Sequence, residues 1–381
     1  MTTRFDWRVA DSRHLLQHLW GIWADTLVCC CQSLVSSSCL DHKPTLSDCA
    51  RNAARVMALI SARYADLRGH DERLGRLWQR SEHYATTLAP ADVTKRLLDG
   101  VEPVLPTRAA NGWLSLYDAD TAHTIDTATH EAQRIARVLC ADALQTSLAP
   151  LDRRWQLPRR PGRPAGFLIE DQVNSGTPTG TPGRFVHGAM FTIELCAAEL
   201  CAAALALHAL EVPTGLLADI SKQVYDEMRH FDMLAGLLER HDTKIGDHPI
   251  DTLIWDKFLL GETLAERLVI EQRLGEGIGL DGGYALYAKF IAANDYHASQ
   301  CFDFINADEM THVRNGNRWI EYLVGGPEQR AALDAKMRER LADHSWPVRH
   351  REPINTTDRS LAGFSQVEIE DIQNMARGAT P

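Results

Sequence analysis

The chain carries the pattern Asp-Glu-Met-x-His twice, as "DEMRH" at 226–230 and again as "DEMTH" at 308–312. On a helix, a glutamate and a histidine three residues apart lie on the same face. Mostly apolar residues continue that face at steps of three and four, as Ile220, Val224, Phe231, Leu234 and Leu238 around the first copy and Phe302, Ile305, Gly316, Trp319 and Leu323 around the second. The fold must therefore bury a Glu-His pair on each of two helices.

A further glutamate precedes each pair at the same distance. The interval from Glu194 to Glu227 equals the interval from Glu276 to Glu309. Buried carboxylates are costly unless their charge is compensated, and bound cations compensate it well. One glutamate from each of two helices, with Glu-x-x-His from each of two others, is the ligand set of a dinuclear metal site in a four-helix bundle. The predicted metal ligands are Glu194, Glu227, His230, Glu276, Glu309 and His312.

The donor atoms narrow the choice of metal. Carboxylates and imidazoles favour two iron ions (Fe2+/Fe3+), with manganese as the alternative, and disfavour a thiolate site for zinc or copper. The main competing interpretation is that the acids form structural ion pairs with Arg229 or Arg314.

An aspartate stands directly before the glutamate of each pair, at Asp226 and Asp308. A carboxylate that accepts a hydrogen bond from the free ring nitrogen of a ligand histidine fixes the tautomer and orientation of that ring. We expect this contact to run across the bundle, from His230 to Asp308 and from His312 to Asp226.

Two glutamates of the third helix compete for the ligand position. Glu271 lies on the apolar stripe of this helix, whereas Glu276 has Gln272 and Arg273 one turn before it. Spacing favours Glu276, because it reproduces the interval of the first hairpin. A change to Glu271 would also shift the carboxylate by about 7.5 Å along the helix axis. The ligand prediction is therefore Glu276, with Glu271 in a supporting or surface role.

Most of the chain has the composition and periodicity of helices. Helices are predicted around 8–35, 46–67, 72–87 and 112–148, and then around 185–210, 214–240, 251–278 and 294–324. The glycines of "GIGLDGG" at 277–283 are expected to end the third helix of the second group. The predicted fold is all-α, divided into an N-terminal helical region at 1–150, a Pro/Gly-rich linker at 151–184, the metal bundle at 185–325 and a C-terminal extension at 326–381.

Composition limits the partners and the compartment. The formal net charge of −11 disfavours nucleic acid as a partner, although a local basic stretch occurs at 152–164. The nine cysteines form no CxxC pair, and the N-terminus lacks the apolar core of a signal peptide. We therefore expect a cytoplasmic protein with reduced thiols and no membrane partner. The apolar run at 19–35 is too short to span a membrane and carries Asp25, so it predicts a buried helix.

Four segments resemble the DUF455 proteins, a ferritin-like family related to the tRNA-hydroxylase branch of diiron proteins. They are "VHGAMFTIELCAAEL" at 186–200, "YDEMRHFDML" at 225–234, "LGEGIGLD" at 274–281 and "ADEMTHVRNGNRW" at 307–319. The resemblance covers about 183–325 and implies a ferritin-like four-helix bundle. It assigns the ligand roles to the same six residues, including Glu276.

Together, the site and the resemblance predict a non-haem diiron oxidase or oxygenase, an O2-dependent oxidoreductase acting on a small organic substrate. The expected partners are O2, that substrate and an electron donor, and the expected state is a monomer or homodimer. A ferroxidase or iron-storage role is the first alternative, which the additional N-terminal region at 1–150 disfavours. A tRNA-modifying hydroxylase is the second, and a scaffold without metal is the third.

Overall fold

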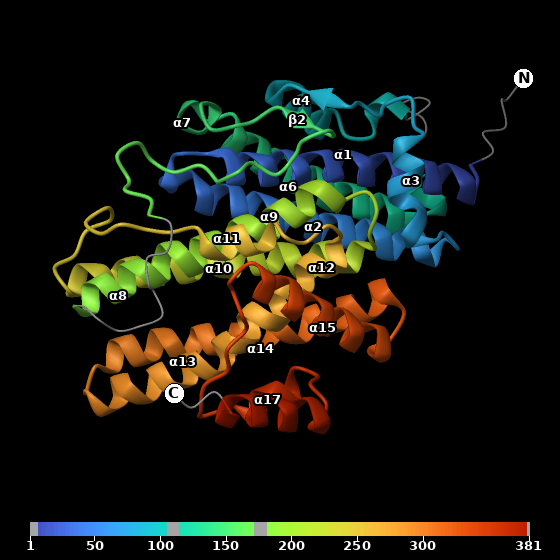
Figure 1. The fold of residues 1–381 in the computed structure, drawn as a ribbon. Coiled ribbons are helices and arrows are strands. Elements are labelled where there is room, and N and C mark those ends of the chain that lie inside the picture. The colour runs from blue at the N-terminus through green and yellow to red at the C-terminus, as the bar shows by residue number, and fades with distance from the viewer. Residues whose placement is uncertain (1–6, 105–113, 171–180, 379–381) are drawn as a thin grey trace, which may run out of the picture. The chain divides into compact units, whose positions relative to one another are not determined.

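The computed structural model describes residues 7–104, 114–170 and 181–378, and most of them lie in helices (Figure 1). This confirms the all-α prediction. The α-helices are α1 Val9–Ser36, α2 Lys43–Asp66, α3 Leu74–Gln79, α4 Pro90–Asp99, α6 Ala119–Leu139, α7 Asp142–Gln145, α8 Pro182–Gly188, α9 Leu195–His208, α10 Thr214–Arg240, α11 Leu253–Phe258, α12 Leu264–Leu268, α13 Glu276–Ala292, α14 Tyr296–Val324, α15 Pro327–Asp343, α16 Thr356–Leu361 and α17 Gln366–Gly378.

Short 3-10 and π segments and one small sheet complete the described elements. The 3-10 turns are η1 Leu40–His42, η2 Asp71–Arg73 and η3 Glu102–Val104. The π-helical segments are η4 Ala189–Glu194 and η5 Val269–Gly275. Strands β1 Thr87–Leu88 and β2 Leu151–Asp152 pair antiparallel.

The chain forms two compact units. The first comprises Met1–Ala165 and Cys201–Tyr225, and the second comprises Gly166–Leu200 and Asp226–Pro381. Helices α9 and α10 each contribute residues to both units. The boundaries between the units therefore fall inside the predicted segments 151–184 and 185–325.

In the first unit, α1 is the central helix and packs against α2, α3, α4 and α6. It is apolar around most of its circumference, as expected of a helix enclosed by others. Asp25 in its middle is buried and accepts a hydrogen bond from Trp78 Nε1 at 3.1 Å and another from Arg153. These donors allow a carboxylate in an otherwise apolar helix.

One local prediction for this unit is wrong. The helix predicted at 72–87 ends at Gln79, because the following backbone pairs with β2: Arg153 N donates to Thr86 O at 2.9 Å. The predicted linker at 151–184 begins with β2 and ends with the first turn of α8, where Thr181 caps the helix and Pro182 stands at its first position. Residues 171–180 of that linker and 112–113 of the helix predicted at 112–148 lie outside the described residues.

Four helical segments correspond to those predicted after the linker, and the second unit contains the third, the fourth and part of each of the first two. The first runs without interruption from α8 through η4 into α9, the second is α10, and the fourth is α14. The third differs from the prediction. It divides into α11 and a continuous helix of α12, η5 and α13, which a capping box of Thr263 and Glu266 begins.

The prediction that "GIGLDGG" ends the third helix is wrong, because α13 continues to Ala292. One of the glycines instead permits close packing. A Cβ atom at Gly283 would lie 1.9 Å from Asn306 Oδ1 on α14, and one at Gly277 would lie 3.6 Å from Arg359 Nη1. The lack of a side chain at Gly283 lets α14 approach α13 closely, whereas the space beside Gly277 would admit a Cβ atom in ordinary contact.

The C-terminal helices share a core with α13 and α14. Leu280 of α13 and Val313 of α14 share a buried cluster with apolar residues of the segment that follows α15, among them Phe364, Ile369 and Ile372. Figure 1 shows α17 beside α14 and α15. Arg359 is fully buried and donates to the Gly277 carbonyl and to Asp281. The extension predicted at 326–381 is thus packed onto the third and fourth helices.

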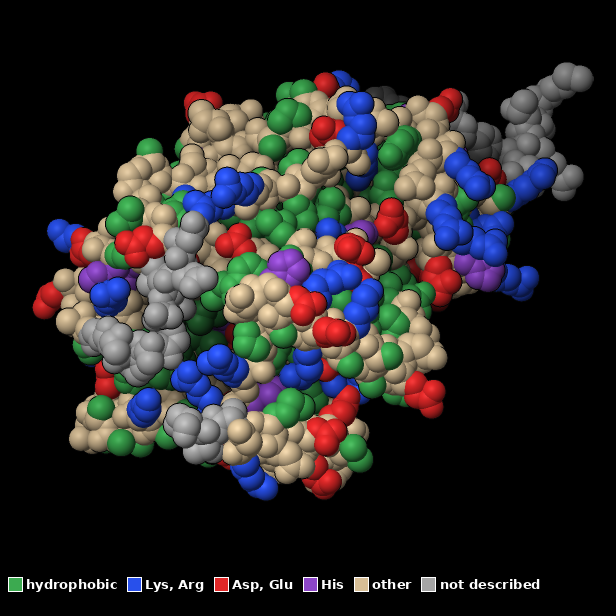
Figure 2. Space-filling model, in the orientation of Figure 1, with side chains coloured by type: hydrophobic (Ala, Val, Ile, Leu, Met, Phe, Trp, Pro, Cys, Tyr) green, Lys and Arg blue, Asp and Glu red, His purple; other side chains and the backbone are tan. Residues whose placement is uncertain are grey.

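Two helices, α1 and the continuous helix Pro182–His208, are long and apolar enough to cross a membrane by length and composition alone. Their most apolar windows are 94% and 83% buried inside the molecule, as in core helices of soluble proteins, so they are weak evidence for a membrane span. On the face seen in Figure 2, basic and acidic side chains are interspersed.

Candidate metal centre

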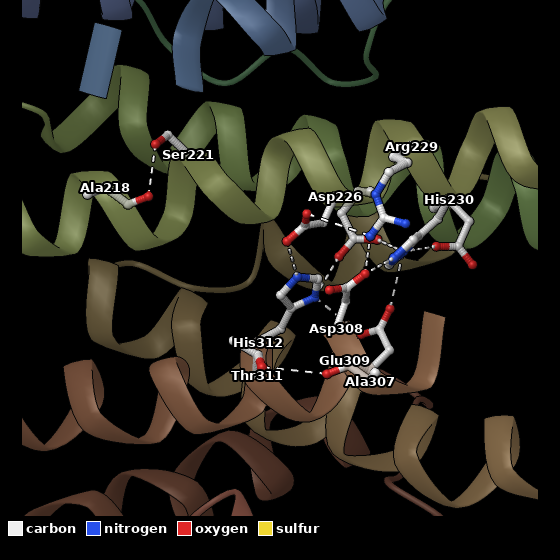
Figure 3. A network of polar contacts seen from close by, with 12 residues as sticks. Ala218, Ser221, Asp226, Arg229, His230, Ala307, Asp308, Glu309, Thr311 and His312 are labelled. Carbon is white, nitrogen blue, oxygen red and sulfur yellow. Dashed lines mark hydrogen bonds and ion pairs between the residues drawn. The ribbon is translucent and has the colours of Figure 1, made fainter. Parts of the chain in front are cut away.

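The two Glu-His pairs lie near the middle of α10 and α14 and point toward each other (Figure 3). Glu227 and His230 are 1% and 0% exposed, and Glu309 and His312 are 7% and 2% exposed. Helical periodicity places each pair on the apolar face of its helix, as the sequence indicated. The side chains of both glutamates and both histidines are therefore held out of water.

One ring nitrogen of each histidine faces the carboxylates. His230 Nδ1 lies 3.2 Å from Glu194 Oε2, 3.3 Å from Glu227 Oε2 and 3.6 Å from Glu309 Oε1. His312 Nδ1 lies 3.1 Å from Glu227 Oε1 and 3.4 Å from Glu309 Oε2. The two rings, with centroids 6.1 Å apart, thus address one common group of acids.

The other ring nitrogen faces an aspartate on the opposite helix. His230 Nε2 lies 3.2 Å from Asp308 Oδ2, and His312 Nε2 lies 3.3 Å from Asp226 Oδ2. Both contacts expected from the sequence are therefore present. Arg229 donates to Asp308 and lies 3.8 Å from Asp226. The arginine that was considered as an ion-pair partner of the acids therefore contacts the two aspartates.

The donor atoms form two overlapping groups, each with its atoms within 4.8 Å of one another. One group is Glu194, Glu227, His230 and Glu309, and the other is Glu227, Glu276, Glu309 and His312. The structure thus brings together all six residues that the sequence singled out as ligands. Glu227 and Glu309 belong to both groups, which is the arrangement needed for two cations that share two carboxylates.

Burial and crowding perturb the titration of these acids. Burial raises the pKa of Glu194 to about 8, and burial together with the charges of Glu309 and Glu227 raises that of Glu276 well above its ordinary value. Burial also acts on Glu227, but hydrogen bonds from His230 and His312 outweigh it and lower its pKa. Without a cation, protons on the flanking glutamates limit the negative charge of the cluster.

The histidines respond in the opposite sense. Burial lowers the pKa of a histidine, but the hydrogen bonds that the His230 ring donates to Asp308, Glu194 and Glu227 outweigh burial and raise its pKa well above the ordinary value. Asp226 and Glu227 have the same effect on His312. The acids thus favour a positive charge at each ring, and a metal ion bound at Nδ1 would take the place of a proton there.

Two buried atoms of the cluster indicate room for a further partner. His312 Nδ1 and Glu309 Oε2 are buried and make no hydrogen bond of acceptable geometry to any described residue. Such atoms are rare in folded proteins. A cation between them would satisfy both, and the oxygen and imidazole donors suit iron or manganese. The residues therefore fit a dinuclear centre.

The two single glutamates lie at π-helical segments, which sequence periodicity missed. Glu194 is the last residue of η4, and Glu276 directly follows η5. In each segment a backbone N–H bonds five residues back, from Leu195 to Met190 and from Glu276 to Glu271. Such π turns often occur at functional sites. Glu271, assigned a supporting or surface role from the sequence, is 5% exposed and faces the cluster.

Comparisons with known proteins concern the family of the chain and not its function. An uncharacterized protein of Haemophilus influenzae is 29% identical over 147 residues, which cover 38% of this chain and 50% of that protein. The chain thus spans about half the length of this curated relative. No solved structure matches the chain. The family described as "Protein of unknown function (DUF455)" matches residues 118–370, which include every residue of the cluster and extend beyond the motifs at both ends. The chain therefore belongs to the DUF455 family.

Proposed function

We propose that this protein is a non-haem dinuclear iron enzyme with a ferritin-like bundle, which uses O2 to oxidise a small organic substrate. One observation carries the proposal: Nδ1 of both histidines faces the same group of buried carboxylates. The helix α8–α9, α10, the helix α12–α13 and α14 each supply part of this group. That distribution corresponds to the four-helix arrangement of dinuclear carboxylate sites.

When bound, two iron ions would supply the electrons for the reduction of O2. The chain itself supplies position and charge. Glu227 and Glu309 would serve both metal positions, with Glu194 and His230 completing one and Glu276 and His312 the other. Burial of all six side chains keeps bulk water away from the centre.

The aspartates control the histidine rings. If Nε2–H of His230 donates to Asp308, the lone pair of Nδ1 is directed into the cluster, and the same holds for His312 with Asp226. Arg229 balances part of the aspartate charge at the partly exposed side of the cluster. The six ligands and the two aspartates thus form one connected unit.

The first test is metal content under anaerobic conditions. The protein should bind about two equivalents of iron or manganese per chain, the capacity of a dinuclear site. His230→Ala and His312→Ala should each lose at least one equivalent and keep the helical circular dichroism spectrum. His297→Ala, at an exposed position on α14, should bind as the wild type does. Full occupancy in either of the first two variants would remove that histidine from the ligand set.

The second test separates oxidation chemistry from iron handling. Anaerobic Fe(II)-loaded protein is mixed with O2 and followed by stopped-flow absorbance and O2 consumption, with and without candidate substrates. Faster decay of the absorbance with one substrate, together with formation of its oxidised product, is the expected result. Continued iron uptake far beyond two equivalents would instead support a ferroxidase or storage role. Binding of two equivalents with no O2 consumption would contradict the oxidase proposal.

A further inference from the structure

Glu271 and Glu276 are five residues apart on one helix, yet both are buried and both interact electrostatically with Glu227 and Glu309. In a regular α-helix, two residues at this spacing differ by about 140° around the axis. Here the π turn of η5 intervenes, and the N–H of Glu276 donates to the carbonyl of Glu271. The additional residue in that turn brings positions five apart close to one side of the helix. The π turn thus reconciles the two indications from the sequence, because helical periodicity favoured Glu271 and the repeat spacing favoured Glu276.

The surroundings of Glu271 consist largely of the cluster itself. Glu227, Glu309, Glu276 and His312 act on it electrostatically, although its carboxyl group belongs to neither of the two donor groups. Lys257 on α11 is near enough to interact with its charge, but the part of the chain that the structure describes has no salt bridge between the two. A buried carboxylate without a paired cation is costly, and a cation bound beside Glu271 would remove that cost.

The position of Glu271 also breaks the internal repeat. The interval that separates the two Asp-Glu-Met-x-His copies relates all six predicted ligands and both aspartates in pairs, but it pairs Glu271 with Ala189. Ala189 begins η4 and is 8% exposed, so the first half of the site has a buried methyl group where the second has a carboxylate. His312, whose Nδ1 lies 3.1 Å from Glu227 Oε1 without hydrogen-bond geometry, belongs to the second half, in one donor group with Glu276.

We propose that Glu271 is a fifth glutamate ligand of the centre and serves the metal position of Glu276 and His312. This inference rests on the proposed dinuclear site and makes its two positions unequal. The metal position at Glu194 and His230 would have one glutamate that serves it alone, which is Glu194. The other position would have two such glutamates, Glu271 and Glu276. The two metal ions should therefore bind with different affinities, the tighter one at the position with the additional carboxylate.

The test is calorimetric titration with Mn2+ in the absence of O2. Wild-type protein should show two binding steps of different affinity. Glu271→Gln, which keeps the shape of the side chain and removes its charge, should weaken the tighter step by about 10-fold or more, as expected for loss of a ligand contact. The weaker step should change by less than about 2-fold. Glu199→Gln, at another buried glutamate, on α9, should leave both steps unchanged.

The visible spectrum of the Co2+-loaded protein distinguishes a direct ligand from a neighbour of one, because it reports the coordination number and donor set of each ion. Glu271→Gln should alter the band of one cobalt ion and leave that of the other unchanged. An unaltered spectrum at full cobalt loading, even with weaker binding, would show that Glu271 only positions Glu276 and would overturn the assignment. Identical Mn2+ binding by wild type and variant would also overturn it. A wild type that binds no metal would instead refute the dinuclear site itself.

Discussion

Each histidine of the centre uses one ring nitrogen toward the carboxylates and the other toward an aspartate. Metal affinity should therefore depend on residues that would not touch the metal. The carboxylates of Asp226 and Asp308 accept from Nε2 at 3.3 Å and 3.2 Å. An asparagine in either place can present an amide N–H to the ring, which favours the tautomer that carries its proton on Nδ1. That tautomer cannot bind a metal through Nδ1.

We predict that Asp226→Asn and Asp308→Asn each weaken metal binding by about 10–100-fold and leave the fold intact. Competition of the variants with a chromophoric chelator measures the affinity, and circular dichroism monitors the fold. Asp303→Asn, at an exposed aspartate on α14, is the matched control. Unchanged affinity in both variants would make the two aspartates ordinary helix acids.

The candidate ligands could be found from the sequence because they obey local rules. A Glu-x-x-His pair on an apolar stripe needs only helical periodicity, and the equal intervals from Glu194 to Glu227 and from Glu276 to Glu309 need only two hairpins of equal length. The shared inward orientation of Glu271 and Glu276 could not be found in this way, because periodicity places only Glu271 on the apolar stripe. It depends on a π turn, and the residues Val269–Gly275 carry no pattern that distinguishes such a turn from a regular helix.

At the scale of elements, the third helix shows why glycine is an ambiguous signal. The run "GIGLDGG" is typical of a helix end, yet it lies inside α13. The cost of a glycine in a helix, about 1 kcal/mol, is offset at Gly283 by the close approach of α14. This contact comes from a residue far along the chain, Asn306, so local sequence could not reveal it.

Arg359 fastens the C-terminal segment to α13, directly after Glu276. Its guanidinium donates to the carbonyl of Gly277 and to Asp281 Oδ2 at 2.7 Å, and it stacks over Phe364 at 5.1 Å from the ring centroid. We predict that Arg359→Ala destabilises the protein by about 3–5 kcal/mol, because it leaves the Asp281 carboxylate buried without its partner. Urea unfolding measures the change.

The control for this variant is Arg377→Ala. The Arg377–Glu352 pair is exposed, with a 3.5 Å separation, and such surface pairs contribute about 1 kcal/mol or less. Similar losses of stability in the two variants would show that the buried contacts of Arg359 have no special weight.

At the scale of the whole molecule, the helical content followed from composition and periodicity, but the division into units did not. Helix α10 matches its predicted bounds of 214–240, yet its residues up to Tyr225 belong to one unit and those from Asp226 to the other. Sequence boundaries are inferred from breaks such as proline and glycine runs. A boundary inside an unbroken helix leaves no such mark.

Stability as a function of pH is a further property of the whole molecule, and His350 gives it a testable direction. His350 is 4% exposed, and its Nε2 lies 3.2 Å from Arg338 Nη1. Burial, followed by the charges of Arg338 and Arg359, lowers the pKa of His350 from 6.5 to about 4. The unfolded chain therefore binds a proton between these two values that the folded chain does not bind. Stability from this histidine is complete above about pH 6.5 and is lost as the pH falls toward 4.

We predict that the wild type loses about 2 kcal/mol more of its unfolding free energy between pH 7 and pH 5 than His350→Gln does. The glutamine can still accept from Arg338, but it has no proton to gain, so that part of the acid sensitivity disappears. Urea titrations at the two pH values measure the difference. His344→Gln serves as the control, because the imidazole of His344, in the same region, is exposed to water in the folded protein and should leave the pH dependence of the wild type in place. If the wild type and His350→Gln lose equal free energy on acidification, His350 is protonated as readily in the folded protein as in the unfolded chain, and the buried contact with Arg338 does not govern its charge.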